Sequence, residues 1–247
     1  MRDIVILSII QGICEWFPIS SSGHLYIFHK LLGLKPDINL DIFLHSSSIL
    51  AILIFFRKEI WEIIKVFFSF DTGNENFKTI LYIICATFIT GIIGFLLKDY
   101  EEILENKKVV SLGFLITSIF LFLSKKNGNK RIDFETSLII GLSQGLALLP
   151  GISRSGTTIS TAKILGVNDN DSFNFSFILA IPTIIGAILL KFEELKDIRF
   201  DYVITGFLIT LLVSIITLYL LKKIFIRRKF QYFCIYTFIV FLFSLFI

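Results

Sequence analysis

The chain has 247 residues, of which 55% are hydrophobic and only 18% are charged, and its mean hydropathy is +0.81. A soluble domain is closer to roughly half apolar and about a quarter charged, so a soluble, disordered or disulfide-stapled chain is excluded. The net charge is +4, from 24 Lys and Arg against 20 Asp and Glu, and the bases lie in loops. Nucleic acid is therefore not an expected partner.

Apolar runs separated by short charged loops predict an all-α, polytopic membrane helical bundle, with the whole chain, 1–247, as one integral-membrane domain. About six full spans are expected, at 40–56, 79–97, 109–123, 172–190, 202–221 and 231–247. The apolar stretch 60–70 is interrupted by Glu62 and Lys65, and we expect it to lie at the membrane interface.

Two apolar segments are too short to cross a membrane. Ile4–Phe17 and Ser137–Leu149 each stop at a proline, and at 1.5 Å per residue each gives roughly 20 Å of helix against a hydrocarbon core of about 30 Å. Each is followed by a Ser- and Gly-rich turn and a second short helical stretch, at 22–32 and 155–165. We therefore expect two re-entrant helical hairpins, a shape tolerated at membrane depth only where protein buries it or it lines a cavity.

The two hairpins are similar in sequence. QGICEWFPISSSG at 11–23 and QGLALLPGISRSG at 144–156 share six of thirteen residues at an offset of 133. Because these segments lie between matching short helices, duplication explains them better than chance. The internal repeats are expected at about 1–123 and 134–247.

Loop charge predicts how the two repeats are oriented. Thirteen Lys and Arg residues lie in the loops at 57–78, 124–131 and 222–229, and eight lie in those at 30–37, 98–108 and 191–201. The more basic set is expected in the cytoplasm. The first hairpin then enters from the outer face and the second from the inner face, so that the repeats are inverted and their tips meet near the middle of the membrane.

Polar residues that are costly within a membrane gather on the two tips. Gln11 and Glu15 are four residues apart and share one helix face. The other residues expected to form the site are Ser20, Ser21, Ser22, Gly23 and His24 in the first hairpin and Ser153, Arg154, Ser155, Gly156 and Thr157 in the second.

These residue types suit an anion site. Arg154 can clamp a phosphate with two hydrogen bonds, and Gly23 and Gly156 lie where the start of a helix favours negative charge. Glu15 can hold Mg²⁺ together with substrate oxygens, and His24 can act as a nucleophile or as an acid and base. The set predicts phosphoryl transfer to water. The alternative is a Glu15–Arg154 ion pair that only joins the hairpins, but this explains neither the serines nor the glycines.

The motifs QGxxEWFPISSSGHL at 11–25 and PGISRSGTT at 150–158 resemble the two signature motifs of the undecaprenyl-diphosphate phosphatase family of the bacitracin-resistance type. The resemblance covers essentially the whole chain, including DxxxH at 41–45 and FSFILAIP at 175–182. It implies an integral-membrane hydrolase that removes one phosphate from the C55 isoprenyl diphosphate carrier, recycles the carrier for cell-wall synthesis and confers bacitracin resistance. It also implies a bacterial plasma membrane, with the site facing the outer side.

The resemblance further implies roles for single residues. The acidic motif maps onto Gln11 and Glu15, and the arginine motif maps onto Arg154. The serine–histidine motif maps onto Ser21 and His24, and attack on phosphorus by Ser21 with His24 as acid and base is favoured over attack by His24. Family members need a divalent cation, expected here as Mg²⁺ or Ca²⁺ at Glu15. Gln11 and the remaining tip residues are expected to bind the substrate.

Other readings stay open. An inverted-repeat transporter or flippase of a phospholipid or anion has the same architecture, although a carrier has no need of Ser and His on a turn. Asp41 and His45, four residues apart on one predicted helix, suit a pair that supports the site, but equally a helix cap and a packed core histidine. The expected partners are the prenyl diphosphate and membrane lipids, and a homodimer is one alternative assembly.

Overall fold

A computed structural model describes residues 1–34, 38–69, 72–100, 106–125, 128–190 and 200–247. Within these ranges the ordered elements are helices, and the β-type pairing is limited to an isolated bridge between Lys130 and Val167. The predicted all-α class is confirmed. Parts of the loops whose charge predicts the orientation, 35–37, 70–71, 101–105, 126–127 and 191–199, lie outside the described residues.

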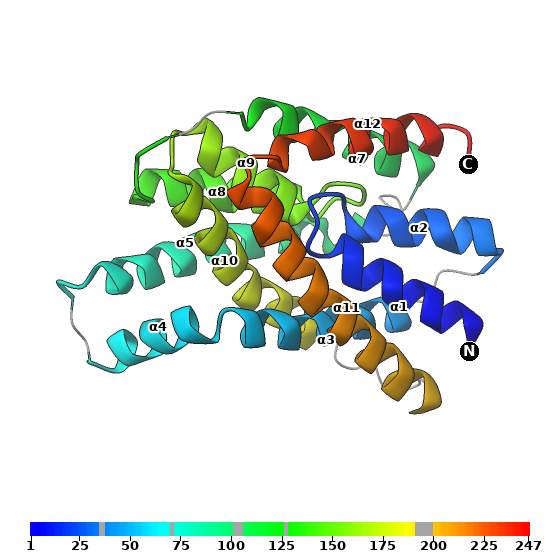
Figure 1. Ribbon diagram of the computed structural model, residues 1–247, viewed down its shortest axis with the longest axis horizontal. Coiled ribbons are helices and arrows are strands. Elements are labelled where there is room, and N and C mark those ends of the chain that lie inside the picture. Colours follow the sequence, from blue (N-terminus) through cyan, green and yellow to red (C-terminus); the bar gives the residue numbers. More distant parts are fainter. Residues whose placement is uncertain (35–37, 70–71, 101–105, 126–127, 191–199) are drawn as a thin grey trace.

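Each stretch that the sequence predicts as helical contains a helix (Figure 1). The hairpin helices are α1 (Arg2–Cys14), α2 (Ser21–Leu32), α8 (Phe134–Leu146) and α9 (Arg154–Ile164). The predicted spans correspond to α3 (Ile38–Phe55), α5 (Glu75–Leu97), α7 (Lys107–Leu123), α10 (Asp169–Leu190), α11 (Phe200–Ile226) and α12 (Phe233–Ser244). The stretch at 60–70 lies in α4 (Arg57–Ser69), and the short helices η1 (Lys98–Tyr100) and η3 (Phe230–Tyr232) complete the described elements.

Three of the described helices, α5, α10 and α11, are long and apolar enough to cross a membrane. The apolar segments Phe43–Phe55 and Phe230–Ser244 are shorter. Large apolar side chains are exposed on the outside of the bundle, such as Phe88 at 68% and Leu212 at 61% exposure. An apolar exterior of this kind is the surface of a protein that lies in a membrane. The count of six full spans stays a prediction.

Helices α1 and α8 end earlier than the sequence suggests. α1 ends at Cys14 and α8 at Leu146, whereas the apolar runs continue to the residue before each proline. The α conformation is disfavoured for a residue before proline. In both segments the helix therefore ends about one turn before the proline. Glu15 consequently occupies the C-cap of α1, where the turn begins.

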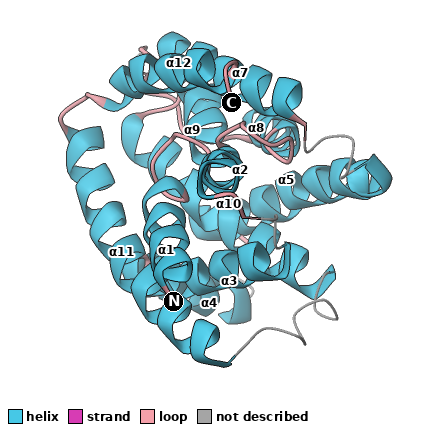
Figure 2. Ribbon diagram, turned by 90° about the vertical axis from the view of Figure 1, so that its right-hand side faces the viewer, coloured by secondary structure: helices cyan, strands magenta, loops and turns pink. Residues whose placement is uncertain are grey.

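The packing of the helices brings the two hairpins together. α7 packs along α12, α5 along α8, and α11 contacts both α1 and α3. In Figure 1 the α1–α2 turn points toward the α8–α9 turn near the centre of the molecule, and both termini lie at the same end. In Figure 2, turned by 90°, α2 is seen end-on in the middle of the bundle.

Glycines permit this approach of backbone to backbone. A Cβ atom on Gly113 of α7 would lie 2.3 Å from the carbonyl oxygen of Pro150, and one on Gly23 of α2 would lie 2.9 Å from the Cα atom of Gly151. Gly151 itself has φ +86°, a conformation that favours glycine. The tips therefore meet at a distance that larger residues do not allow.

Candidate active site

Two hydrogen bonds join the tips of the hairpins among the described residues. The Ser155 hydroxyl donates to the Trp16 carbonyl at 3.2 Å, and the Arg154 guanidinium lies 2.9 Å from the Glu15 carboxylate. Ser21 and Arg154 are each the first residue of the second helix in their hairpin. The predicted meeting of the two tips is thus observed.

A cavity of about 340 Å³ lies between the tips. Its described polar lining includes six of the predicted site residues, Glu15, Ser20, Ser21, Ser22, Ser153 and Arg154. Its apolar wall comes from the turn after α8 and from α10, with Ala147, Leu148, Ile152, Ile184, Ala187 and Ile188. Six other predicted residues do not line it, namely Gln11, Gly23, His24, Ser155, Gly156 and Thr157. The cavity is thus polar at one end and apolar at the other.

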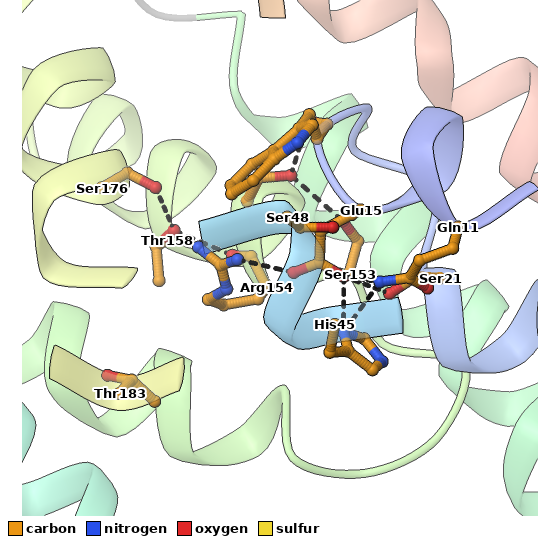
Figure 3. A network of polar contacts seen from close by, with 12 residues as sticks. Gln11, Glu15, Ser21, His45, Ser48, Ser153, Arg154, Thr158, Ser176 and Thr183 are labelled. Atoms are coloured by element: carbon orange, nitrogen blue, oxygen red, sulfur yellow. Dashed lines mark hydrogen bonds and ion pairs between the residues drawn. The ribbon is translucent and has the colours of Figure 1, made fainter. Parts of the chain in front are cut away.

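Glu15 is the centre of the polar end (Figure 3). Its Oε1 atom accepts from Nη2 of Arg154 at 2.9 Å, and its Oε2 atom accepts from the Ser21 hydroxyl at 2.7 Å. The Gln11 amide also donates to Oε2, at 3.1 Å. The predicted shared face of Gln11 and Glu15 is confirmed by this contact. The carboxylate side chain is only 7% exposed, so these partners take the place of water.

One hydrogen-bond donor of Arg154 has no partner among the described residues. Its side chain is 13% exposed and lies over the ring of Trp16, with Cζ 5.7 Å from the ring centroid. Nη2 is used by Glu15, but Nη1 is buried and has no hydrogen-bond partner among the described residues. Buried donors are nearly always paired. A guanidinium nitrogen without a partner beside a cavity is therefore a site for an oxygen of a bound ligand.

His45 of α3 also lines the cavity, although it is not among the residues that the sequence predicts to form the site. Its Nδ1 atom lies 3.0 Å from Oε2 of Glu15 and 2.9 Å from Nε2 of Gln11. The spacing of Asp41 and His45 on one helix was the signal in the sequence, but it suited a packed core histidine equally well. The side chain of Asp41 lies outside the described residues.

His24 has a different environment from the one expected. It is 5% exposed, and its Nδ1 atom lies 2.7 Å from the carbonyl oxygen of Ser20. Its Nε2 atom lies 2.8 Å from the hydroxyl of Tyr236 in α12. Both ring nitrogens are thus engaged within the protein, whereas Ser21 and Arg154 face the cavity. His24 is not among the described residues that line the cavity with Glu15, Ser21 and Arg154.

The glycine amides at the tips also have protein partners. The Gly23 amide donates to the hydroxyl of Ser20 at 3.2 Å, and the Gly156 amide donates to the hydroxyl of Ser153 at 3.1 Å. Both serines are N-caps of the helices that follow. Serine oxygens therefore accept from both glycine amides, and the helix dipole is what these helix starts still offer to an anion.

The second hairpin contributes a glutamine to the cavity. Gln144, which corresponds to Gln11 at the sequence offset of 133, donates from Nε2 to the hydroxyls of Thr183 at 2.9 Å and Thr90 at 3.1 Å. Its Oε1 atom is buried without a partner among the described residues. Thr183 was not recognised from the sequence, because an isolated threonine in a span carries no motif.

Gln11 and Glu15 carry oxygen atoms that suit a divalent cation. Oε1 of Gln11 is buried and lacks a partner among the described residues, and it belongs to the side chain that contacts Glu15. Amide and carboxylate oxygens are ligands that Mg²⁺ and Ca²⁺ accept. The described residues contain no cluster of three or more His, Cys, Asp and Glu that would hold a metal alone. A cation at this position fits the donor set if ligand oxygens complete its coordination.

Comparison with known proteins gives consistent matches over nearly the full length. Residues 4–243 match the family model of the bacitracin resistance protein BacA. An undecaprenyl-diphosphatase of Thermosipho melanesiensis is 39% identical over 246 residues, covering 97% of this chain and 96% of the relative. That of Borreliella burgdorferi strain ZS7 is 39% identical over 249 residues, covering 95% and 93%. That of Methanococcus vannielii is 36% identical over 249 residues, covering 98% of each.

Proposed function

The chain belongs to the family of the bacitracin resistance protein BacA, and from this premise we propose that it hydrolyses undecaprenyl diphosphate to undecaprenyl phosphate and inorganic phosphate. Relatives that carry the name undecaprenyl-diphosphatase match nearly the whole chain. The observation that carries the proposal is the unpartnered Nη1 atom of Arg154, whose Nη2 atom shares the Glu15 carboxylate with the Ser21 hydroxyl. Recycling of the lipid carrier for cell-wall synthesis and resistance to bacitracin follow from this activity.

The shape of the cavity supports a lipid diphosphate as the substrate. Its polar end offers Arg154 and the serine hydroxyls to phosphate oxygens, and its apolar end offers Leu148, Ile184 and Ile188 to hydrocarbon. At about 340 Å³ the cavity accommodates a head group and the first part of a prenyl chain. The remaining chain then extends along the apolar exterior into the membrane, the natural solvent of an isoprenoid.

Ser21 is the proposed nucleophile, because its hydroxyl already donates to Oε2 of Glu15 at 2.7 Å. As Ser21 Oγ bonds to the terminal phosphorus, its proton moves to Glu15, the bond from phosphorus to the bridging oxygen breaks, and undecaprenyl phosphate leaves. After Glu15 loses this proton to solvent, water attacks the phosphoserine and gives a proton to Glu15. Glu15 passes this proton to Ser21 as the Ser–O–P bond breaks and phosphate is released. Arg154 stabilises the charge on the transferring group.

A divalent cation, Mg²⁺ or Ca²⁺, is the proposed cofactor. Glu15 and Oε1 of Gln11 would hold it together with diphosphate oxygens. When bound, it would offset the negative charge of the diphosphate and withdraw electron density from the phosphorus. The protein side chains supply binding, orientation and proton transfer.

The proposed architecture is an inverted repeat of about 1–123 and 134–247 with six full spans, in the plasma membrane of a bacterium. The site would open to the outer side, as the loop charge indicates. The test is a reporter fused to each end of the chain, and both are expected outside. Cytoplasmic signals from both ends would contradict this topology. Membrane lipids surround the protein, and a homodimer is the assembly that mass measurement in detergent or lipid would test.

The deciding experiment measures phosphate release from C55 diphosphate by the purified protein, with and without a chelator, for wild type and Arg154→Ala. Release by wild type alone, abolished by chelation, supports the proposal. A transporter or flippase of phospholipid or anion is the second candidate, since broken helices and inverted repeats are also found in carriers. Movement of the lipid across vesicles without any phosphate release would favour that candidate.

A further inference from the structure

We propose that His24 and Tyr236 form a positioning pair, which holds the Ser20 turn in the shape that directs the Ser21 hydroxyl at Glu15. This inference rests on the proposed role of Ser21 as the nucleophile. In this proposal His24 supports the turn that carries Ser21, and Tyr236 of the C-terminal helix contributes to the site.

The hydrogen bonds of His24 determine where its protons lie. A carbonyl oxygen only accepts, so the contact of 2.7 Å with the Ser20 carbonyl requires a hydrogen on Nδ1. In the neutral ring Nε2 then carries a lone pair, which accepts from the Tyr236 hydroxyl at 2.8 Å. Neither nitrogen is left to take a proton from Ser21. The ring is fixed further by stacking on Tyr236, with centroids 5.7 Å apart, and by edge contact with Phe114 at 5.3 Å.

The residue that His24 holds has an unusual backbone. Ser20 has φ +69° and ψ 105°, a region that residues other than glycine rarely adopt and that persists only where the surroundings enforce it. Its carbonyl oxygen accepts from the amide of His24 at 3.2 Å as well as from the ring. Ser20 directly precedes Ser21, so a rotation at Ser20 would displace the Ser21 hydroxyl from Glu15.

The second hairpin makes the same bond without a histidine. At an offset of 133, Thr157 corresponds to His24, and its hydroxyl donates to the carbonyl of Ser153 at 2.9 Å. The neighbouring bonds also correspond, since each N-cap serine accepts from a glycine amide three residues later. Threonine has no acid–base function near neutral pH. A side chain at this position therefore serves in both hairpins to hold the carbonyl of the N-cap residue.

Isosteric substitutions separate positioning from proton transfer. In His24→Asn the amide nitrogen can reach the place of Nδ1 and donate to Ser20, whereas in His24→Gln it reaches the place of Nε2 and the bond to Ser20 is lost. We expect His24→Asn to retain at least about a tenth of the wild-type kcat with KM within about twofold, and His24→Gln to lose about a hundredfold, since displacement of a reacting group by about 1 Å has this effect. Equal inactivity of both variants in folded protein would overturn the proposal.

The tyrosine is tested by Tyr236→Phe, which keeps the ring and removes the hydroxyl. We expect kcat to fall by about three- to tenfold with KM unchanged. Tyr232→Phe, at an exposed tyrosine in η3, is the matched control and is expected to behave as wild type. A Tyr236→Phe variant with wild-type kcat would remove Tyr236 from the pair.

A spectroscopic measurement does not depend on the folding of any variant. In wild-type protein labelled with ¹⁵N-histidine, His24 is expected as the tautomer with hydrogen on Nδ1, its signal identified by its loss in His24→Asn. Hydrogen on Nε2 alone would overturn the proposal. If wild-type protein released no phosphate from C55 diphosphate, the proposed function would fail, while the tautomer would still report whether His24 holds Ser20.

Discussion

Glu15 and Arg154, which are 139 residues apart in the sequence, form a buried ion pair of 2.9 Å across the tips of the two hairpins. If the pair only joined the hairpins, every N–H group of the guanidinium would have a hydrogen-bond partner, because buried polar groups are normally paired. Instead, Nη1 of Arg154 has no partner among the described residues. The pair therefore both joins the tips and leaves a donor for the substrate, and the two roles can be separated by substitution.

Arg154→Gln alone leaves the Glu15 carboxylate buried without its counter-ion, and we expect the unfolding free energy to fall by about 3–5 kcal/mol. The double variant Glu15→Gln/Arg154→Gln removes both charges and is expected to recover most of this loss. Hydrolysis should be lost in both variants, by at least about 10³-fold. The measurements are thermal unfolding in detergent and phosphate release. Recovery of activity in the double variant would show that the pair is only structural.

The control for this comparison is an exposed ion pair. Lys78 and Glu75 lie 3.3 Å apart with side chains 49% and 64% exposed. Pairs of this kind contribute about 0–1 kcal/mol, so Lys78→Gln should leave both unfolding and activity near wild type.

Ser21→Ala is expected to lower kcat by at least about 10³-fold with little change in KM, because the variant lacks the proposed attacking oxygen. Substrate labelled in its terminal phosphate and quenched during turnover should leave label on wild-type protein and none on Ser21→Ala. Ser22→Ala is the matched control, since Ser22 lines the same cavity, and it should still be labelled. Label on Ser21→Ala would place the nucleophile elsewhere.

Gly113→Ala is expected to destabilise the protein by about 1–3 kcal/mol, the usual effect of overpacking. The added Cβ atom would lie 2.3 Å from the Pro150 carbonyl oxygen and 2.8 Å from the Cα atom of Gly151, so the α8–α9 turn must move. Activity should fall with stability, because Arg154 follows that turn. Gly91→Ala in α5, where the Cβ atom meets nothing within 4 Å, should be neutral. Tolerance of alanine at 113 would show that the tips are not closely packed.

The helices and the meeting of the tips were predictable because both depend on local patterns. Apolar runs bounded by charged loops define the helices, and prolines end the first helix of each hairpin. The similar motifs of the two hairpins predict equivalent positions for Ser21 and Arg154, and in the structure each is the first residue of a helix. Glu15 and Gln11 share a face because four residues make about one helical turn.

The environments of His24 and His45 could not be predicted, because they depend on helices distant in the sequence. His24 has the motif position of a catalytic residue, but its ring nitrogens are bound by a carbonyl of its own turn and by Tyr236, 212 residues away. His45 lacks such a motif and reaches Glu15 only because α3 packs beside α1. The amides of Gly23 and Gly156 are capped by serines that the sequence also offered to phosphate.

Removal of divalent cations with a chelator is expected to abolish hydrolysis, and the two residues proposed to hold the cation can be tested without turnover. Gln11→Glu exchanges the unpartnered Oε1 atom for part of a second carboxylate. The added charge should tighten the binding of Mg²⁺ or Ca²⁺ by about tenfold when a non-hydrolysable diphosphate is present. Glu15→Gln should weaken it by a similar factor or more. Calorimetric titration of the metal measures both. Gln144→Glu is the control that should leave the affinity unchanged, because Gln144 corresponds to Gln11 in the second hairpin but contacts Thr90 and Thr183. Equal tightening in the Gln11 and Gln144 variants would mean that the added charge acts without a specific site, and the proposed metal position beside Glu15 would be wrong.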